Sequence, residues 1–234
     1  MNDDQFMRVD AEAAFTYDAR GRMLLTNEPC MDARRPAPRL FVGRTLMGLI
    51  VRVGASVPDM LAEQVLATLS RERSARDLRE PLAGAAALRS TLAPVETETA
   101  GPSYRFPESL VAPRAGAEVI PLTLANRDLA AETYRWLYDE IRDWQPCFAV
   151  VRDGAAVSIC FSSRVGARAA AAGVDTRAEF RGRGYASAVT AAWAAAVRAT
   201  GRMPFYGTAW DNLASQGVAR CLGLVMFGAQ LTWT

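Results

Sequence analysis

The feature that most constrains this chain is a run of local signals between residues 147 and 201. The segment CFAVVRDGAAVSICF predicts a β-hairpin, because Asp153 and Gly154 supply the positive φ angles that a two-residue turn requires. A further strand is expected over about 168–176, followed by a glycine-containing loop and a helix that ends at Gly201. This order of elements predicts an α/β organisation for the C-terminal half.

The segments around this run extend the same pattern. Asn126 is a candidate N-cap for a helix that Pro146 ends. After the run, PFYGTAW predicts a short strand, Asn212 predicts the start of a helix that ends at Gly223, and AQLTWT predicts a closing strand. The tryptophans of these helices fall on apolar faces and are expected in the core; they are Trp136, Trp144 and Trp193.

The first fifty or so residues predict β structure. The segment FTYDARGRMLLT, residues 15–26, has two apolar runs around a turn that contains glycine, and residues 39–53 predict one long strand or two short ones. Ser56 is a candidate cap for a helix whose solvated end is the charged stretch 71–80. A second short helix is expected over about 83–92.

Residues 94–118 contain four prolines and show no clear periodicity, which indicates a linker or an extended, docked segment. The chain therefore divides into an N-terminal β and helical extension over 1–93, this Pro-rich segment, and an α/β region over 119–234. We expect the N-terminal extension to dock beside any site in the third part.

The composition excludes several kinds of chemistry. All 27 basic residues are arginine, and there is no lysine or histidine. Histidine-based catalytic triads, histidine-bound zinc, a P-loop lysine and a lysine Schiff base are therefore excluded. The four cysteines form no Cys-x-x-Cys pair and are expected in the core, so no metal site is predicted.

The charge pattern and the N-terminus point to a cytoplasmic chain. The arginines are spread along the sequence and balanced by 25 acidic residues, which does not favour nucleic-acid binding. The segment MNDDQFMRVD is acidic and unlike a secretory signal, and no apolar run is long enough to span a membrane. We expect neither nucleic acid nor membrane as a partner, and either a monomer or a homodimer.

The segment EFRGRGYASAVTAAW places charged and flexible residues at the start of a helix. The first N–H groups of a helix lack partners and attract anions, Gly182 and Gly184 allow close approach, and Arg181 and Arg183 can bind phosphate oxygens. A pyrophosphate site is therefore predicted. A dinucleotide fingerprint does not fit because Ser187 stands at its third glycine, and a surface loop with solvated arginines is the alternative.

The motif RGRGYA resembles the acetyl-coenzyme A signature of the GNAT acyltransferase superfamily, with Arg181, Gly184 and Ala186 at the defining positions. The segment WDNLASQGVARCLGL, residues 210–224, resembles the family's Asn-bearing helix, and the resemblance covers about 119–234. It implies an α/β (α+β) fold with a mixed, splayed sheet whose gap admits acetyl-CoA. In that picture the residues that bind the cofactor are Val174, Asp175, Thr176, Arg181, Gly182, Arg183, Gly184, Tyr185, Ala186, Asn212 and Ser215.

The resemblance weakens at the catalytic positions. The tyrosine that usually acts as the general acid in the family aligns with Ala219. The glutamate that the family often has on the strand before the loop falls in an alanine stretch here. Ser215 or Tyr206 is a candidate acid and Asp175 a candidate base, although these residues also have structural interpretations as a helix cap, a core or rim residue and a strand end. Catalysis then depends largely on proximity and on backbone amides.

The sequence thus predicts an acyl-CoA-dependent N-acyltransferase that moves an acetyl group to a small-molecule or peptide amine by direct attack on the thioester. One alternative is a catalytically silent GNAT-like module that binds coenzyme A. A second is a structural protein whose loop binds nothing.

Overall fold

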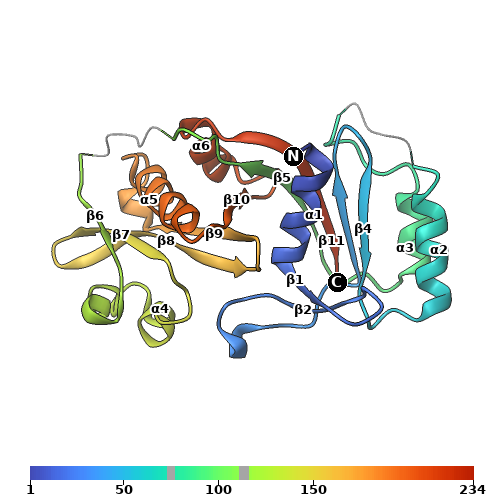
Figure 1. Cartoon of the computed structure of the whole chain (residues 1–234), viewed down its shortest axis with the longest axis horizontal. Coiled ribbons are helices and arrows are strands. Elements are labelled where there is room, and N and C mark those ends of the chain that lie inside the picture. The colour runs from blue at the N-terminus through green and yellow to red at the C-terminus, as the bar shows by residue number, and fades with distance from the viewer. Residues whose placement is uncertain (73–76, 111–115) are drawn as a thin grey trace.

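The computed structural model describes residues 1–72, 77–110 and 116–234. Its centre is a nine-stranded sheet with the order β4-β3-β11-β5-β10-β9-β8-β7-β6, beside a separate β1–β2 pair (Figure 1). Within this sheet β9 and β10 are parallel, and the other neighbours are antiparallel. The expected mixed α/β fold is confirmed. The strands are β1 Phe15–Tyr17, β2 Met23–Thr26, β3 Leu40–Arg44, β4 Leu49–Val53, β5 Glu98–Arg105, β6 Val119–Pro121, β7 Cys147–Arg152, β8 Ala155–Val165, β9 Ala169–Thr176, β10 Met203–Gly207 and β11 Val225–Trp233.

The hairpins follow the local sequence signals. Asp153 and Gly154 have φ angles of 50° and 79° and join β7 to β8 as predicted. The β1–β2 hairpin forms within residues 15–26, and residues 39–53 form the two short strands β3 and β4.

The Pro-rich segment supplies a central strand. β5 lies between β10 and β11 and is antiparallel to both. The sequence predicted either a linker or an extended, docked segment over 94–118, and β5 agrees with the extended segment. Residues 111–115 lie outside the described residues. Strands from all three parts of the chain therefore share one sheet, and the division at 93 and 118 stays a proposal.

The long C-terminal helices begin and end close to where the sequence predicts. α5 spans Tyr185–Ala199 and α6 spans Leu213–Cys221, with Asn212 as the N-cap of α6. α2 spans Asp59–Leu69, α3 spans Ala85–Thr91 and α4 spans Arg135–Glu140. The expected charged end of α2 falls partly on 73–76, which lie outside the described residues.

Two predicted helix caps are wrong. Pro58 occupies the N-cap of α2, so Ser56 lies outside that helix. Thr123, not Asn126, caps the next helical segment, the 3₁₀ helix η2 Leu124–Ala130, and Asn126 is the third residue of its capping box. Non-helical angles at Asn126 and the break before α4 replace the single long helix expected up to Pro146.

The N-terminal helix α1, Asp3–Ala14, corrects the expectation of β structure at the start of the chain. The side chains of Asn2 and Gln5 form a capping box around its first turn. Met7 packs against Gly43 and Gly228, where a Cβ atom would meet its side chain at 2.4 and 2.5 Å. The sheet therefore has room for α1 because two strands carry glycine beneath it.

The helices cover both faces of the sheet. α5 packs on one face of β7–β10, while η2 and α4 pack on the other (Figure 1). Trp144 and Trp193 are buried as predicted, but Trp136 is 42% exposed. Three cysteines are buried and Cys221 is exposed, which corrects the expectation that all four are core residues. No helix in the described residues is long and apolar enough to cross a membrane.

Candidate functional site

A gap opens in the middle of the sheet between β9 and β10. Their parallel pairing runs from Met203–Ala169 to Phe205–Ala171 and stops there. On its other side β9 stays paired with β8 as far as Thr176. Residues 172–176 thus have a strand on one side only, and the sheet is splayed where the family resemblance implies.

A tight loop connects the splayed end of β9 to α5. The chain passes through the 3₁₀ helix η3, Ala178–Phe180, and then through Arg181 to Gly184. Gly182 and Gly184 have φ angles of 75° and 78°, a region that residues with a Cβ atom rarely adopt. Gly184 is the N-cap of α5, so the loop is the start of a helix, as the predicted anion site requires.

The amides at this helix start have no partners within the protein. Among the described residues, none accepts a hydrogen bond from the backbone N–H groups of 182–187. Residues 181–184 are exposed, whereas Tyr185 and Ser187 are buried. Unpaired amides at the positive end of a fifteen-residue helix form a site suited to an anion.

The two predicted arginines flank these amides. The Nε atom of Arg181 donates to the carbonyl oxygen of Thr176 at 3.1 Å, which ties the loop to the end of β9. Arg183 donates to the carbonyl oxygen of Glu179 at 3.1 Å and lies over the ring of Phe180. The carboxylate of Glu179 pairs with Arg177.

Arg152 is a third cation that sequence reasoning missed. It ends β7, and its guanidinium lies 5.1 Å from the ring centroid of Tyr185, the first residue of α5. No local signal links Arg152 to the loop, because the contact depends on the register that brings β7, β8 and β9 together. Arginines therefore reach the helix start from two separate segments.

On the far side of the gap, Tyr206 and Ser215 form a hydrogen-bonded pair. Their hydroxyl oxygens are 2.6 Å apart, and burial raises the pKa of Tyr206 to about 12. The backbone N–H of Ser215 donates to the Oδ1 atom of Asn212 at 3.0 Å. Asn212 and Ser215 thus serve the cap of α6, and the structure brings Ser215 and Tyr206 together.

The third predicted catalytic residue lies on the other face of the sheet. Val174 packs with Tyr206 in the core under α5, and adjacent strand residues point to opposite faces, so Asp175 points away from this core. Its charge is one of the causes that raise the pKa of Tyr134, whose largest cause is burial. Asp175 is exposed at the splayed end of β9. The structure therefore separates it from the Tyr206–Ser215 pair.

The remaining predicted residues lie in the first turn of α5, at the end of β9 and in α6. Ala186 and the buried Tyr185 form the first turn of α5, and the side chain of Thr176 shares a buried hydrogen bond of 2.7 Å with Ser158. Ala219 is 1% exposed in the core between α6 and the sheet. Within the described residues, no group of His, Cys, Asp and Glu side chains has the arrangement of a metal site.

The C-terminal region matches a known family in sequence. Residues 146–228 match the model of the GNAT acetyltransferase family. This segment contains the splayed strands, the loop, α5 and α6, so the resemblance to the GNAT superfamily is confirmed there. No curated protein matches the chain in sequence.

Solved structures extend the likeness to the fold of the whole chain. A GCN5-related N-acetyltransferase-like protein from Streptococcus suis 89/1591 aligns over 100% of both chains at 12% identity, with a TM-score of 0.50. A GCN5-related N-acetyltransferase from Sphaerobacter thermophilus aligns over 80% of this chain and 71% of its own at 15% identity and a TM-score of 0.50. A GNAT-family protein from Novosphingobium aromaticivorans DSM 12444 aligns over 59% of this chain at 19% identity and a TM-score of 0.47, and the match spans 65% of that protein. At these identities the first two structures establish the fold.

Proposed function

We propose that this protein is an acyl-CoA-dependent N-acyltransferase that transfers an acetyl group to a small-molecule or peptide amine. The observation that carries the proposal is the splayed end of β9 beside a helix start whose amides have no protein partner. A gap with one unpaired strand fits an extended chain that carries its own amides, and the helix start fits a diphosphate at the end of that chain. Acetyl-CoA has both features.

The loop supplies binding energy in several small parts. A charge at a helix start contributes about 0.3–1 kcal/mol when exposed and up to about 2 kcal/mol when partly buried. Arg152, Arg181 and Arg183 each add a permanent charge that can bind phosphate oxygens. Val174 then offers its backbone N–H and C=O groups to the pantetheine arm, because the backbone groups of Asp175 face β8.

In the proposed reaction the amine nitrogen attacks the thioester carbonyl carbon, and the carbon–sulfur bond breaks. The amine loses a proton to Asp175 through water, and the departing thiolate takes a proton from the hydroxyl of Tyr206, directly or through Ser215. Burial raises the pKa of Tyr206 to about 12, so this phenol is protonated before the reaction and regains its proton from solvent afterwards, while Asp175 releases its proton to solvent. Asp175 and Tyr206 lie on opposite faces of the sheet, so each of the two proton transfers has its own group in this proposal.

The N-terminal part supports the acceptor side in this proposal. α1 packs below β9 on the face opposite α5, where Ala13 lies against Gly166 in the turn before β9. The segment around Cys30 joins the core beneath β7 and β8. The acceptor therefore meets residues of the N-terminal extension when it approaches the gap from the face that carries Asp175.

A coenzyme A binding module without turnover is the second candidate. The buried Ala219 at the family's usual tyrosine position favours it, because no hydroxyl is available there. Calorimetric titration with acetyl-CoA tests the shared part of both proposals, and we expect saturable binding with a Kd of tens of micromolar or tighter, about 6 kcal/mol. Thiol release with a panel of amines then separates them: turnover with any amine supports the enzyme, and binding without turnover supports the module.

A further inference from the structure

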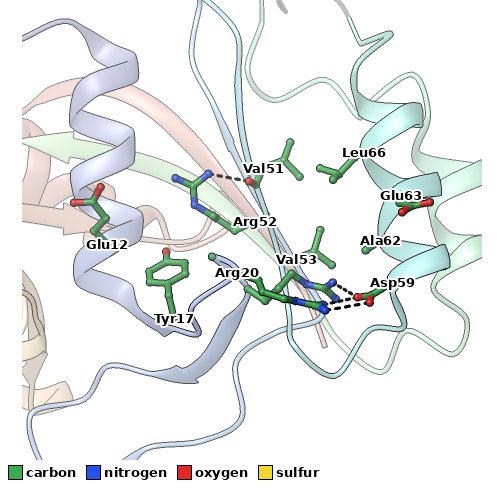
Figure 2. A pocket seen from close by; sticks show the side chains of 12 residues that line it. Glu12, Tyr17, Arg20, Val51, Arg52, Val53, Asp59, Ala62, Glu63 and Leu66 are labelled. Atoms are coloured by element: carbon green, nitrogen blue, oxygen red, sulfur yellow. Dashed lines mark hydrogen bonds and ion pairs between the residues drawn. The ribbon is translucent and has the colours of Figure 1, made fainter.

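The strand β4 forms one end of the nine-stranded sheet and pairs only with β3 among the described strands. A cavity of about 610 Å³ opens along its free side, between α1 with the β1–β2 hairpin and α2 (Figure 2). This volume lies within the range of about 300–1,000 Å³ that is typical of ligand sites. We call this cavity the β4 groove. It shares no lining residue with the loop before α5.

One wall of the β4 groove is largely apolar, although the exposed Glu63 of α2 also lines it. Val51 and Val53 point toward α2, and Ala62 and Leu66 of α2 face them across the groove (Figure 2). Leu66 is 48% exposed. An apolar side chain that enters here gains contacts without displacing any polar partner.

The other wall is polar and carries a cation. Arg52 points toward α1, because neighbouring residues of a strand face opposite sides, and it lies near Tyr17 and Glu12 (Figure 2). Burial raises the pKa of Tyr17, and the nearby Arg52 opposes this shift. Glu12 pairs with Arg168 at 2.7 Å. Within the described parts of the chain, no carboxylate lies at ion-pair distance from Arg52.

The guanidinium of Arg52 covers the backbone of the free edge. Its Nη1 atom donates to the carbonyl oxygen of Val51 at 3.0 Å (Figure 2). Free strand edges bind other strands through their N–H and C=O groups, and charged side chains at the edge reduce such pairing. The edge of β4 is thus protected by Arg52, which forms no ion pair with a carboxylate of the described residues.

We propose that the β4 groove binds an extended peptide segment of a partner protein as an additional strand. The side chains of an extended peptide alternate between its two faces, which matches one apolar wall and one charged wall. An acidic side chain of the peptide pairs with Arg52 and draws it away from Val51. The carbonyl oxygen of Val51 then accepts a hydrogen bond from the peptide backbone.

Three arginines and three carboxylates line the groove, so its net charge selects nothing. Arg52, the arginine without a carboxylate partner among the described residues, favours an acidic peptide over a second copy of this chain. β4 has the sequence LIVRV and contains no acidic residue. If two copies paired through β4, the added strand would therefore bring no carboxylate to Arg52. Arg20 and Arg22 at the end of the groove are already paired with Asp59, so Arg52 is the group that an incoming acid finds free.

Binding of two labelled peptides to the full chain, measured by fluorescence anisotropy, tests the proposal. Each has about eight residues, alternating valine with glutamate in one peptide and with lysine in the other. We expect the glutamate peptide to bind at least about tenfold more tightly than the lysine peptide. The Arg52→Glu variant should reverse this preference, while Arg8→Glu, at an exposed position of α1 outside the groove, should leave it unchanged.

Two further measurements separate the effect of the Arg52 charge from misfolding, and strand pairing from attraction between charges alone. Arg52→Gln keeps a donor for the Val51 carbonyl oxygen but no charge, so it should fold and bind both peptides alike. A glutamate peptide with alternate backbone nitrogens methylated should bind at least about tenfold more weakly, because it has lost its strand-pairing donors. No binding at about 1 mM peptide, equal binding of the methylated peptide, or a preference that survives in both Arg52 variants overturns the proposal. Self-association of the free chain that Arg52→Glu abolishes would also overturn it and assign the edge to a second copy.

Discussion

On two of the strands that have a free side, β9 and β4, an arginine covers a carbonyl oxygen. At the splayed end of β9, Arg181 donates to Thr176 at 3.1 Å, and at the end of the sheet Arg52 donates to Val51 at 3.0 Å. The surroundings differ. The β9 edge lies inside the sheet beside a helix start with unpaired amides, whereas the β4 edge lies between two helical walls of opposite polarity. Similar edges therefore suit different ligands, a diphosphate-bearing chain at β9 and a peptide at β4.

The comparison shows what a strand edge needs in order to become selective. Backbone groups alone accept any extended chain, because every residue presents the same N–H and C=O. Selectivity comes from the group at the end of the edge: several converging donors at β9 and a single guanidinium at β4. In both proposals an arginine covers a carbonyl oxygen of the edge when no ligand is bound.

The largest expected effect is a double dissociation between the two edges. Arg181→Glu combined with Gly184→Val reverses a charge and places a side chain at a φ angle of 78°, so we expect acetyl-CoA affinity to fall at least about a thousandfold. Binding of the glutamate peptide should not change. Arg52→Glu should weaken binding of the glutamate peptide and leave acetyl-CoA affinity unchanged. Isothermal titration of each variant with each ligand measures these four affinities.

A matched control separates local geometry from loss of stability. Gly201 has a φ angle of 77° at the other end of α5 and open space around it. Gly201→Ala therefore carries the same backbone cost as Gly184→Ala, about 1 kcal/mol or more, without touching the loop. Equal loss of acetyl-CoA affinity in the two alanine variants would contradict the anion site.

The sequence predicted the β9 edge well because its signals are local. The Asp153-Gly154 turn, the glycines of the loop and the Asn212 cap each act within a few residues, and each has the predicted structure. The loop residues themselves were also found from sequence. What stayed a prediction is their chemistry, including the roles of Asp175, Tyr206 and Ser215.

The β4 edge could not be predicted in the same way. Its two walls come from α1 and α2, and α1 was missed because its packing depends on glycines in two distant strands. The position of β5 between β10 and β11 is also long-range, since no local pattern indicates which strands a proline-containing segment joins. A search for the capping box of Asn2 and Gln5 would have found α1.

A buried carboxyl in α1, Asp10, is expected to make the stability of the protein depend on pH. Asp10 is 5% exposed, and burial raises its pKa to about 7 although Gln230 donates a hydrogen bond to it. Between its ordinary pKa and about 7, the folded protein keeps this proton while the unfolded chain loses it. Stability therefore falls as pH rises through this range, by a few kcal/mol at about 1.4 kcal/mol per pKa unit.

Asp10→Asn should remove this dependence. Denaturant unfolding at pH 5 and pH 8 should show the variant gaining stability relative to the wild type as pH increases. Glu12→Gln on the same helix is the control, because Glu12 is exposed. If Asp10→Asn leaves the pH dependence of stability unchanged, the carboxyl does not hold its proton in the folded protein. If Asp10→Asn changes the affinity for acetyl-CoA and for the glutamate peptide together, the two edges are not independent.

The hydroxyl of Tyr206 is the next test, with a smaller effect on catalysis. Tyr206→Phe removes the partner of Ser215 and should lower kcat about 10- to 100-fold without changing acetyl-CoA affinity. Tyr104→Phe is the control, since the two rings lie 6.4 Å apart and only Tyr206 pairs with Ser215. Thiol-release kinetics measure both variants. Equal rates in the two would remove Tyr206 from the mechanism.

The smallest effect distinguishes the two roles of Asn212. Its Oδ1 atom accepts from the N–H of Ser215, so Asn212→Ala should lower the free energy of unfolding by about 1 kcal/mol. Asn212→Asp keeps an accepting oxygen and should retain the cap, but it loses the amide donor that a pantetheine arm would use. If Asn212 binds that arm at the β9 edge, the aspartate variant keeps its stability and binds acetyl-CoA more weakly, while its affinity for the glutamate peptide at the β4 edge is unchanged. Unchanged acetyl-CoA affinity would leave Asn212 with the cap alone, and the selectivity of the β9 edge would then rest on the loop before α5.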